Sequence, residues 1–255
     1  MRLAVLVSRH SAFYSPLIAT ITSGFLEREG LDATYGVLEP GQTSREMIAS
    51  GRAHVIQSAV STSWGPMEKG ERDLPVHFAQ INRRDGFFVV GRHPDPDFRW
   101  TNLEGREFLA DHAAQPLAMM MYAARSNGVD WSRVRLVDAG GPDSMESRFR
   151  SGAGDFVQLQ GPAAQQLEAD GVGTVVACAG ASTPPVAFSS LTASRDFLAT
   201  GAARAFLRAY AQARAWVRKS PAGEVAASEA ALFPSVTHGV LAAAIARYQR
   251  LGCWD

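Results

Sequence analysis

Histidine and cysteine are the side chains best suited to metal binding and nucleophilic chemistry, and their spacing in this chain fits neither. The six histidines lie at positions 10, 54, 77, 93, 112 and 238. The two cysteines, Cys178 and Cys253, form no C-x-x-C pair. Zinc sites are built from several closely spaced Cys and His ligands. We therefore predict no metal site.

Motifs for covalent catalysis and for phosphate binding are also missing. The sequence contains no G-x-S-x-G, no P-loop and no G-x-G-x-x-G. Cys178 follows the apolar run 175–177, which has the character of a buried strand, and buried free cysteines are commonly inert. We therefore predict no catalytic residue and no cofactor, and we assign Cys178 a structural role.

Polar side chains gather instead where a predicted strand ends and a helix begins. Hydroxyls, amides and unpaired backbone N–H groups at such places bind anions or polar heads. Phe13 and Tyr14 form either an aromatic wall for the ligand or a lid on the core, and the wall is favoured because small-molecule sites are mostly apolar. The predicted ligand-binding residues are His10, Ser11, Phe13, Tyr14, Gln42, Thr43, Ser58, Ser61, Asn82, His112, Ala113, Gln115 and Gln160.

The composition limits the class of protein and of partner. Of the 255 residues, 46% are hydrophobic and 20% are charged, which suffices for a buried core in a globular protein. The formal net charge is zero, so bulk charge favours neither nucleic acid nor an anionic membrane as partner. No apolar run approaches the ~20 residues of a membrane span. We expect a monomer with a small-molecule ligand.

One stretch of the chain occurs twice. Residues 29–61 and 127–159 both have Gly, an aliphatic residue and Asp directly after their first residue, as Gly30-Leu31-Asp32 and Gly128-Val129-Asp130. Both continue with an extended run, a Gly-containing loop, a short helix that ends at Ser-Gly, and a second apolar run. A chance likeness of two βαβ units is the alternative, but order, spacing and cap residues agree together. The repeat predicts two similar α/β lobes with a ligand cleft between them.

The first lobe follows from alternating strand and helix patterns. Residues 3–7, 33–38 and 55–60 are predicted strands, separated by helices over about 15–29 and 43–50. This alternation predicts parallel pairing with crossover helices. Lobe one is assigned to residues 1–83 and 189–255, and lobe two to residues 84–188. Each lobe is predicted to hold a mixed, mostly parallel sheet flanked by helices.

Several short motifs occur in an order that resembles a known family. They are Gly24-Phe25 through Gly30-Leu31-Asp32, Ser50-Gly51, Asn102-Leu103-Glu104-Gly105-Arg106, Gly128-Val129-Asp130, Gly152-x-Gly-Asp155 and Ser194-Arg195-Asp196-Phe197-Leu198. In this order they resemble the SsuA-type substrate-binding proteins of ABC importers, which belong to the type II periplasmic-binding-protein superfamily and include binders of alkanesulfonates, nitrate and thiamine-pyrimidine precursors. His54 stands where an Asp is usual in that family.

The resemblance implies a protein that closes two lobes on a small anionic or polar organic solute, such as a sulfonate, a carboxylate or a pyrimidine, and passes it to an ABC permease. The alternative is a cytosolic enzyme on the same fold, similar to desulfinases, decarboxylases or pyrimidine synthases, or a cytosolic ligand sensor. Met1-Arg2 is followed by only six residues, LAVLVS, before Arg9, which is too short for a secretory signal. As written the chain is expected in the cytoplasm. If an export signal has been removed, the resemblance implies the periplasm.

Overall fold

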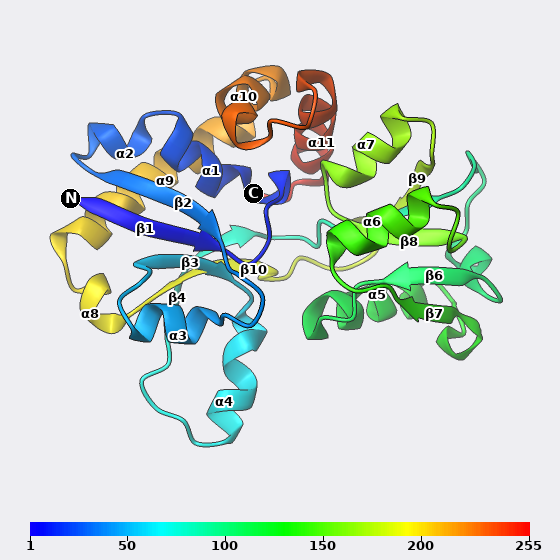
Figure 1. The fold of residues 1–255 in the computed structure, drawn as a ribbon, viewed down its shortest axis with the longest axis horizontal. Helices are drawn as coiled ribbons and strands as arrows, with labels where there is room; N and C mark the ends of the chain where they lie inside the picture. The colour runs from blue at the N-terminus through cyan, green and yellow to red at the C-terminus, as the bar shows by residue number, and fades with distance from the viewer. The chain divides into compact units, whose positions relative to one another are not determined.

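The computed structural model describes all residues from 1 to 255. The chain divides into two compact units, and each contains a five-stranded sheet flanked by helices (Figure 1). The first lobe comprises Met1–Arg83, Ala187–Phe233 and Trp254–Asp255. The second lobe comprises Arg84–Val186 and Pro234–Cys253.

The sheet of the first lobe combines parallel and antiparallel pairings. Its strand order is β2 (Asp32–Val37), β1 (Arg2–Val7), β3 (Val55–Ser58), β10 (Ser189–Ala193) and β4 (Val76–Asn82). Strand β1 is parallel to β2 and β3, while β10 is antiparallel to β3 and β4. Leu3, Val5 and Val7 are fully buried at alternate positions of β1, which is the pattern of a strand with a core-facing side. The predicted mixed sheet is confirmed for this lobe.

Helices of the first lobe cover this sheet and connect its strands. They are η1 (Ala12–Tyr14), α1 (Ser15–Thr22), α2 (Phe25–Arg28), α3 (Ser44–Ala49), η2 (Val60–Ser63), α4 (Trp64–Glu68), α8 (Arg195–Leu198), α9 (Gly201–Lys219), α10 (Ala222–Glu229) and η6 (Ala230–Leu232). The prediction of a single helix over about 15–29 is wrong in one respect. The observed helix is interrupted after Thr22, because Gly24 takes a positive φ of 71°. The third strand ends at Ser58, before the predicted residue 60, because η2 begins at Val60.

The second lobe repeats this sheet arrangement. Its strand order is β7 (Arg135–Asp138), β6 (Glu107–Ala110), β8 (Phe156–Leu159), β5 (Phe88–Gly91) and β9 (Thr174–Cys178). Strand β6 is parallel to β7 and β8, and β5 is antiparallel to β8 and β9. The helices are η3 (Trp100–Leu103), α5 (Ala114–Ser126), η4 (Trp131–Arg133), α6 (Pro142–Arg150), α7 (Ala163–Ala169), η5 (Ala179–Ala181) and α11 (His238–Leu251). The two parts of the repeated stretch therefore form equivalent β-α-β units.

The C-terminal helix is grouped differently from the sequence expectation, which assigned residues 189–255 to the first lobe. Pro234–Cys253 belongs to the second unit. Within that unit, Arg247 of α11 forms an ion pair with Glu168 of α7 at 2.8 Å. The fully buried Tyr248 hydroxyl accepts from the Gly161 N–H at 2.6 Å and donates to the Gly86 carbonyl at 3.2 Å. These contacts join residues far apart in sequence. The periodicity of a helix predicts which face is buried, but it does not predict which distant segment that face packs against.

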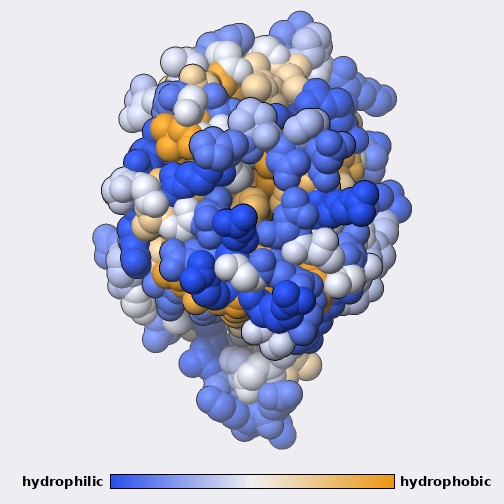
Figure 2. All heavy atoms as spheres, turned by 90° about the vertical axis from the view of Figure 1, so that its right-hand side faces the viewer, coloured by the Kyte–Doolittle hydropathy of each residue, from blue (hydrophilic) through white to orange (hydrophobic).

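The surface and the helices bear on the question of membrane insertion. No helix is long and apolar enough to cross a bilayer. The face of the second lobe that is turned toward the viewer in Figure 2 is mostly hydrophilic, with separate small apolar patches.

A buried carboxyl group lies where α1 and α10 pack together in the first lobe. Glu229 is fully buried, and its Oε2 accepts from the Ser15 hydroxyl at 2.9 Å. Its other oxygen, Oε1, has no hydrogen-bond partner. Burial raises the pKa of Glu229 well above its ordinary value. The neutral acid is therefore the form that the fold favours.

Glu229→Gln should stabilise the protein more at alkaline than at acidic pH. The unfolded chain releases this proton above about pH 4.3, whereas the folded state retains it, so wild-type stability falls as pH rises, by up to about 1.4 kcal/mol per pH unit until the folded-state pKa is reached. Glutamine keeps the shape and cannot ionise. Thermal unfolding at about pH 5 and about pH 8 measures the effect, with the exposed Glu224→Gln on the same helix as control. A variant-to-wild-type difference in Tm that is equal at both pH values contradicts it.

Candidate functional site

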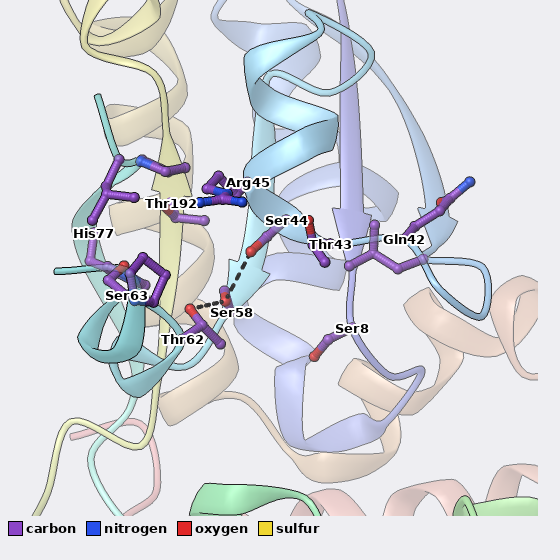
Figure 3. Close-up of a pocket in the computed structure, with 14 residues that line it drawn as sticks. Ser8, Gln42, Thr43, Ser44, Arg45, Ser58, Thr62, Ser63, His77 and Thr192 are labelled. Carbon is purple, nitrogen blue, oxygen red and sulfur yellow. Dashed lines mark hydrogen bonds between the residues drawn. The ribbon is translucent and has the colours of Figure 1, made fainter. Parts of the chain in front are cut away.

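A cavity of about 470 Å³ opens at the carboxyl ends of the parallel strands of the first lobe (Figure 3). Ligands of open α/β sheets bind at this edge. The walls come from the loop after β1, the start of α3, the end of β3, the η2–α4 segment, β4 and β10. The lining residues are Ser8, Leu38, Gln42, Thr43, Ser44, Arg45, Ser58, Thr62, Ser63, Pro66, Leu74, Pro75, His77 and Thr192.

Ser8 is held in the cavity wall by a buried amide. The Ser8 backbone N–H and hydroxyl both donate to Oε1 of Gln57, at 3.0 and 2.7 Å. Gln57 lies opposite Val7 in the parallel pairing of β1 with β3, and its Nε2 donates to the Ser189 hydroxyl at 3.3 Å. Because the Ser8 proton is used in this contact, its oxygen presents lone pairs to other groups.

The hydroxyls of Ser44, Ser58 and Thr62 form a row in which each hydroxyl donates its hydrogen bond in the same direction along the row. Thr62 Oγ1 donates to the Ala59 carbonyl at 2.7 Å, so it accepts from Ser58 Oγ at 3.0 Å. Ser58 Oγ must then accept from Ser44 Oγ, which is 3.5 Å away. Figure 3 shows the row from α3 to the η2 turn. The Ser44 bond is at the limit of hydrogen-bond length, so the Ser44 proton is the easiest of the three to redirect to a ligand.

His77 bridges two hydroxyls across the other side of the cavity. Its Nδ1 lies 2.7 Å from Ser190 Oγ, and its Nε2 lies 3.1 Å from Ser63 Oγ. Burial lowers the pKa of His77 below its ordinary value. The imidazole is therefore neutral at neutral pH.

Arg45 is the single charged residue among the lining side chains, since histidine is neutral here and no acidic residue lines the cavity. It forms an ion pair with Glu71, in the loop that follows α4. Thr192 of β10 is almost fully buried, and its hydroxyl has no hydrogen-bond partner. Arg45 and the Thr192 hydroxyl are hydrogen-bond donors, so the cavity suits a group that accepts hydrogen bonds.

Of the residues predicted in the first lobe, Gln42, Thr43 and Ser58 line this cavity. The Gln42 amide is bonded to Glu39, and Thr43 forms a capping box with Glu46. Ser61 lies within η2, beside the lining residues Thr62 and Ser63.

The predicted turn after β1 has a different role. Phe13 and Tyr14 are buried, with ring centroids 5.4 Å apart, and Phe13 also packs against Phe188 at 5.7 Å. The Asn82 amide donates to the Phe13 carbonyl at 2.7 Å. Ser11 caps η1 by accepting from the Phe13 N–H. None of these residues lines the cavity of Figure 3.

His10 is also occupied by contacts within the first lobe. Its two ring nitrogens lie 2.9 Å from the Tyr35 hydroxyl and 2.8 Å from the Leu232 carbonyl. The ring stacks on Phe233 with centroids 4.1 Å apart. Burial lowers the pKa of His10, with the Leu232 hydrogen bond acting in the opposite direction.

The residues predicted in the second lobe lie at equivalent strand ends. His112, Ala113 and Gln115 follow β6, and Gln160 follows β8, the strand paired in parallel with it. His112 Nδ1 lies 2.9 Å from the Ala110 carbonyl. The Ala113 N–H donates to Oδ1 of Asp111 at 2.9 Å, so this predicted helix-start amide already has a partner.

Ser44, Arg45, His77 and Thr192 were not predicted to belong to the site. Ser44 and Arg45 adjoin the predicted Thr43, so the position of the helix start could have included them. His77 and Thr192 lie on β4 and β10, which are adjacent only through antiparallel pairing of segments more than a hundred residues apart. The sequence has no local signal for that pairing.

The fold defines the class of protein: each lobe has the sheet arrangement of the two-lobe periplasmic-binding-protein fold. The alkanesulfonate-binding protein SsuA from Xanthomonas axonopodis pv. citri, solved bound to MOPS, matches with a TM-score of 0.72 at 14% identity, covering 96% of this chain and 83% of that one. The periplasmic nitrate-binding protein NrtA from Synechocystis PCC 6803 matches with a TM-score of 0.68 at 15% identity, covering 90% of this chain and 65% of that one.

Sequence comparison specifies the family. Residues 12–224 match the family described as NMT1/THI5 like, so the chain belongs to the NMT1/THI5-like family. YtlA of Bacillus subtilis (strain 168) is 27% identical over 245 residues, which are 94% of this chain and 73% of YtlA. The resemblance drawn from the ordered motifs is thereby confirmed at the level of family and fold.

Cys178 does not have the properties of a nucleophile. It ends β9 of the second lobe and is half-buried. Burial raises the pKa of its thiol to about 12, and the neighbouring Asp85 acts in the same direction. Because the thiolate is the reactive form, the side chain is inert at neutral pH.

Cys178 in the folded protein should react slowly with a thiol reagent. At about pH 8 we expect modification by DTNB to be at least about 100-fold slower than in the urea-unfolded chain, because little thiolate is present. Absorbance of the released thionitrobenzoate measures the rate. The Cys178→Ala variant, in which Cys253 is the remaining thiol, supplies the background. Rapid labelling of native Cys178 contradicts the assigned structural role.

Proposed function

We propose that this chain is a solute-binding protein that captures a small polar or anionic organic molecule for an ABC-type importer. One observation supports it above the others: the first lobe has a cavity at the ligand-binding edge of its sheet, lined by hydroxyls and free of acidic side chains. Membership of the NMT1/THI5-like family and the likeness of the fold to sulfonate- and nitrate-binding proteins are consistent with this role.

The chemistry of the cavity indicates how a solute is held. Hydroxyls of Ser44 and Thr192 supply donors for a polar or anionic head. Leu38, Pro66 and Leu74 supply apolar surface for the body of the molecule. One helix-start amide of α3, the Glu46 N–H, already donates to the Thr43 hydroxyl and is therefore not a donor for the solute. The permease partner, a periplasmic location and the solute classes sulfonate, carboxylate and pyrimidine are parts of this proposal.

Binding is favoured over catalysis by the side chains present. The thiol of Cys178 is protonated and His77 is bonded to hydroxyls at both ring nitrogens. Neither forms a pair of nucleophile and base of the kind that covalent catalysis requires.

A thermal-shift screen with a sulfonate, a carboxylate and an aminopyrimidine tests the proposal. We expect at least one class to raise Tm, because a ligand that binds only the folded state stabilises it. Absence of any shift in all three classes at millimolar concentration contradicts a solute-binding role.

The Ser44→Ala variant locates the site. Loss of the Ser44 hydroxyl should weaken the stabilising ligand by roughly tenfold, which corresponds to one hydrogen bond of about 1.4 kcal/mol. The matched control is Ser50→Ala at the C-cap of the same helix, because the Ser50 hydroxyl donates to the Glu46 carbonyl and Ser50 does not line the cavity. Titration calorimetry measures both. Equal affinities for the two variants place the ligand elsewhere.

A further inference from the structure

We infer that the first-lobe cavity takes an oxyanion and that binding this anion draws a proton onto His77. The inference deepens the proposed function, on which it rests, by naming the ligand class and a proton linked to its binding. Its basis is the direction of the hydrogen bonds around His77.

The proton of neutral His77 can be assigned to Nδ1. Ser190 Oγ donates to the Ser58 carbonyl at 3.1 Å. A hydroxyl has one proton, so Ser190 Oγ must accept from His77 Nδ1 across their 2.7 Å contact. His77 Nε2 then carries the lone pair, and the Ser63 hydroxyl donates to it at 3.1 Å.

Ser63 therefore changes its role with the charge of His77. When His77 is neutral, the Ser63 proton is directed at Nε2, and the oxygen has only lone pairs left for the cavity. When Nε2 is protonated, it donates to Ser63, and the Ser63 proton becomes available to a ligand. Protonation thus adds a positive charge and a hydrogen-bond donor to the same wall, and both changes favour an anion.

Few other charges act on His77. Strand β10 contributes the hydroxyls of Ser190 and Thr192, and η2 contributes Ser63, so neither adds an ionisable group. Helix α3 contributes Arg45, whose charge is paired with Glu71. No carboxylate lines the cavity to compensate an imidazolium in the absence of ligand.

Burial lowers the pKa of His77, so its imidazole is neutral before the ligand binds. An anion in the cavity supplies the missing counter-charge and favours the imidazolium. The Thr192 hydroxyl, which has no partner in the protein, is a further donor for the same ligand. A sulfonate or carboxylate head meets these requirements, whereas a neutral head gains nothing from the added charge.

The test uses methanesulfonate and its neutral analogue dimethyl sulfone. Methanesulfonate stays ionised throughout the range in which histidine titrates, so a pH effect reports on the protein. We expect its Kd to be at least about tenfold lower at about pH 5.5 than at about pH 8, since one pKa unit corresponds to a factor of ten. The Kd of dimethyl sulfone should not change. NMR titration of the histidine rings should show that methanesulfonate raises the pKa of His77.

Two variants separate this role from general effects on the fold. His77→Gln should bind methanesulfonate with an affinity that no longer depends on pH, and Ser63→Ala should weaken binding most at acidic pH. His93→Gln, an exposed histidine of the second lobe, should retain the wild-type pH dependence. Circular dichroism verifies that each variant is folded.

Three results overturn the inference. The first is that the wild-type protein binds methanesulfonate with an affinity that does not depend on pH. The second is that this pH dependence persists in the folded His77→Gln variant. The third is that the protein binds dimethyl sulfone but does not bind methanesulfonate. The last result leaves the proposed solute-binding function standing. Failure of both probes, together with failure of the three-class screen, overturns the proposed function as well.

Discussion

The parallel pairing of β1 with β3 is the constraint on which the first-lobe cavity depends. This pairing places Val7 opposite Gln57, so the Gln57 amide reaches the backbone and hydroxyl of Ser8. It also brings the ends of both strands to one edge, where Ser58 continues into the hydroxyl row. If the register moved by one residue, Gln57 would face the other side of the sheet and Ser8 would lose its support.

The antiparallel strand β10 completes the site from a distant part of the chain. It lies between β3 and β4, and it is the source of both Ser190 and Thr192. Ser190 donates to the Ser58 carbonyl and thereby determines which His77 nitrogen carries the proton. A structural hydrogen bond within the sheet thus sets the donor and acceptor pattern of the cavity wall. The second lobe has the same sheet arrangement, with β5 in the corresponding antiparallel position.

Burial favours the neutral form of three ionisable groups in the two lobes, for the same physical reason. Glu229, Cys178 and His77 each lose water on folding, and the charged form of each is disfavoured. Glu229 and Cys178 lie among packed helices and strands, away from the cavity. His77 differs because the Ser63 hydroxyl beside it can change from hydrogen-bond donor to acceptor, and because His77 lines a cavity that a ligand can enter. Because a solute can reach His77, its protonation can change on binding, whereas the protonation of Glu229 and Cys178 affects only the stability of the fold.

The sequence by itself determined the repeated α/β unit, the mixed sheets and the family, because strand and helix periods, glycine ends and cap residues are local signals. It also indicated the strand ends as the place for Gln42, Thr43 and Ser58. Only the tertiary structure decided that Phe13 and Tyr14 are buried, that α11 packs with α7, and that His77 and Thr192 join the cavity. These outcomes depend on contacts between residues far apart in sequence, and local patterns contain no information about which distant segments pair.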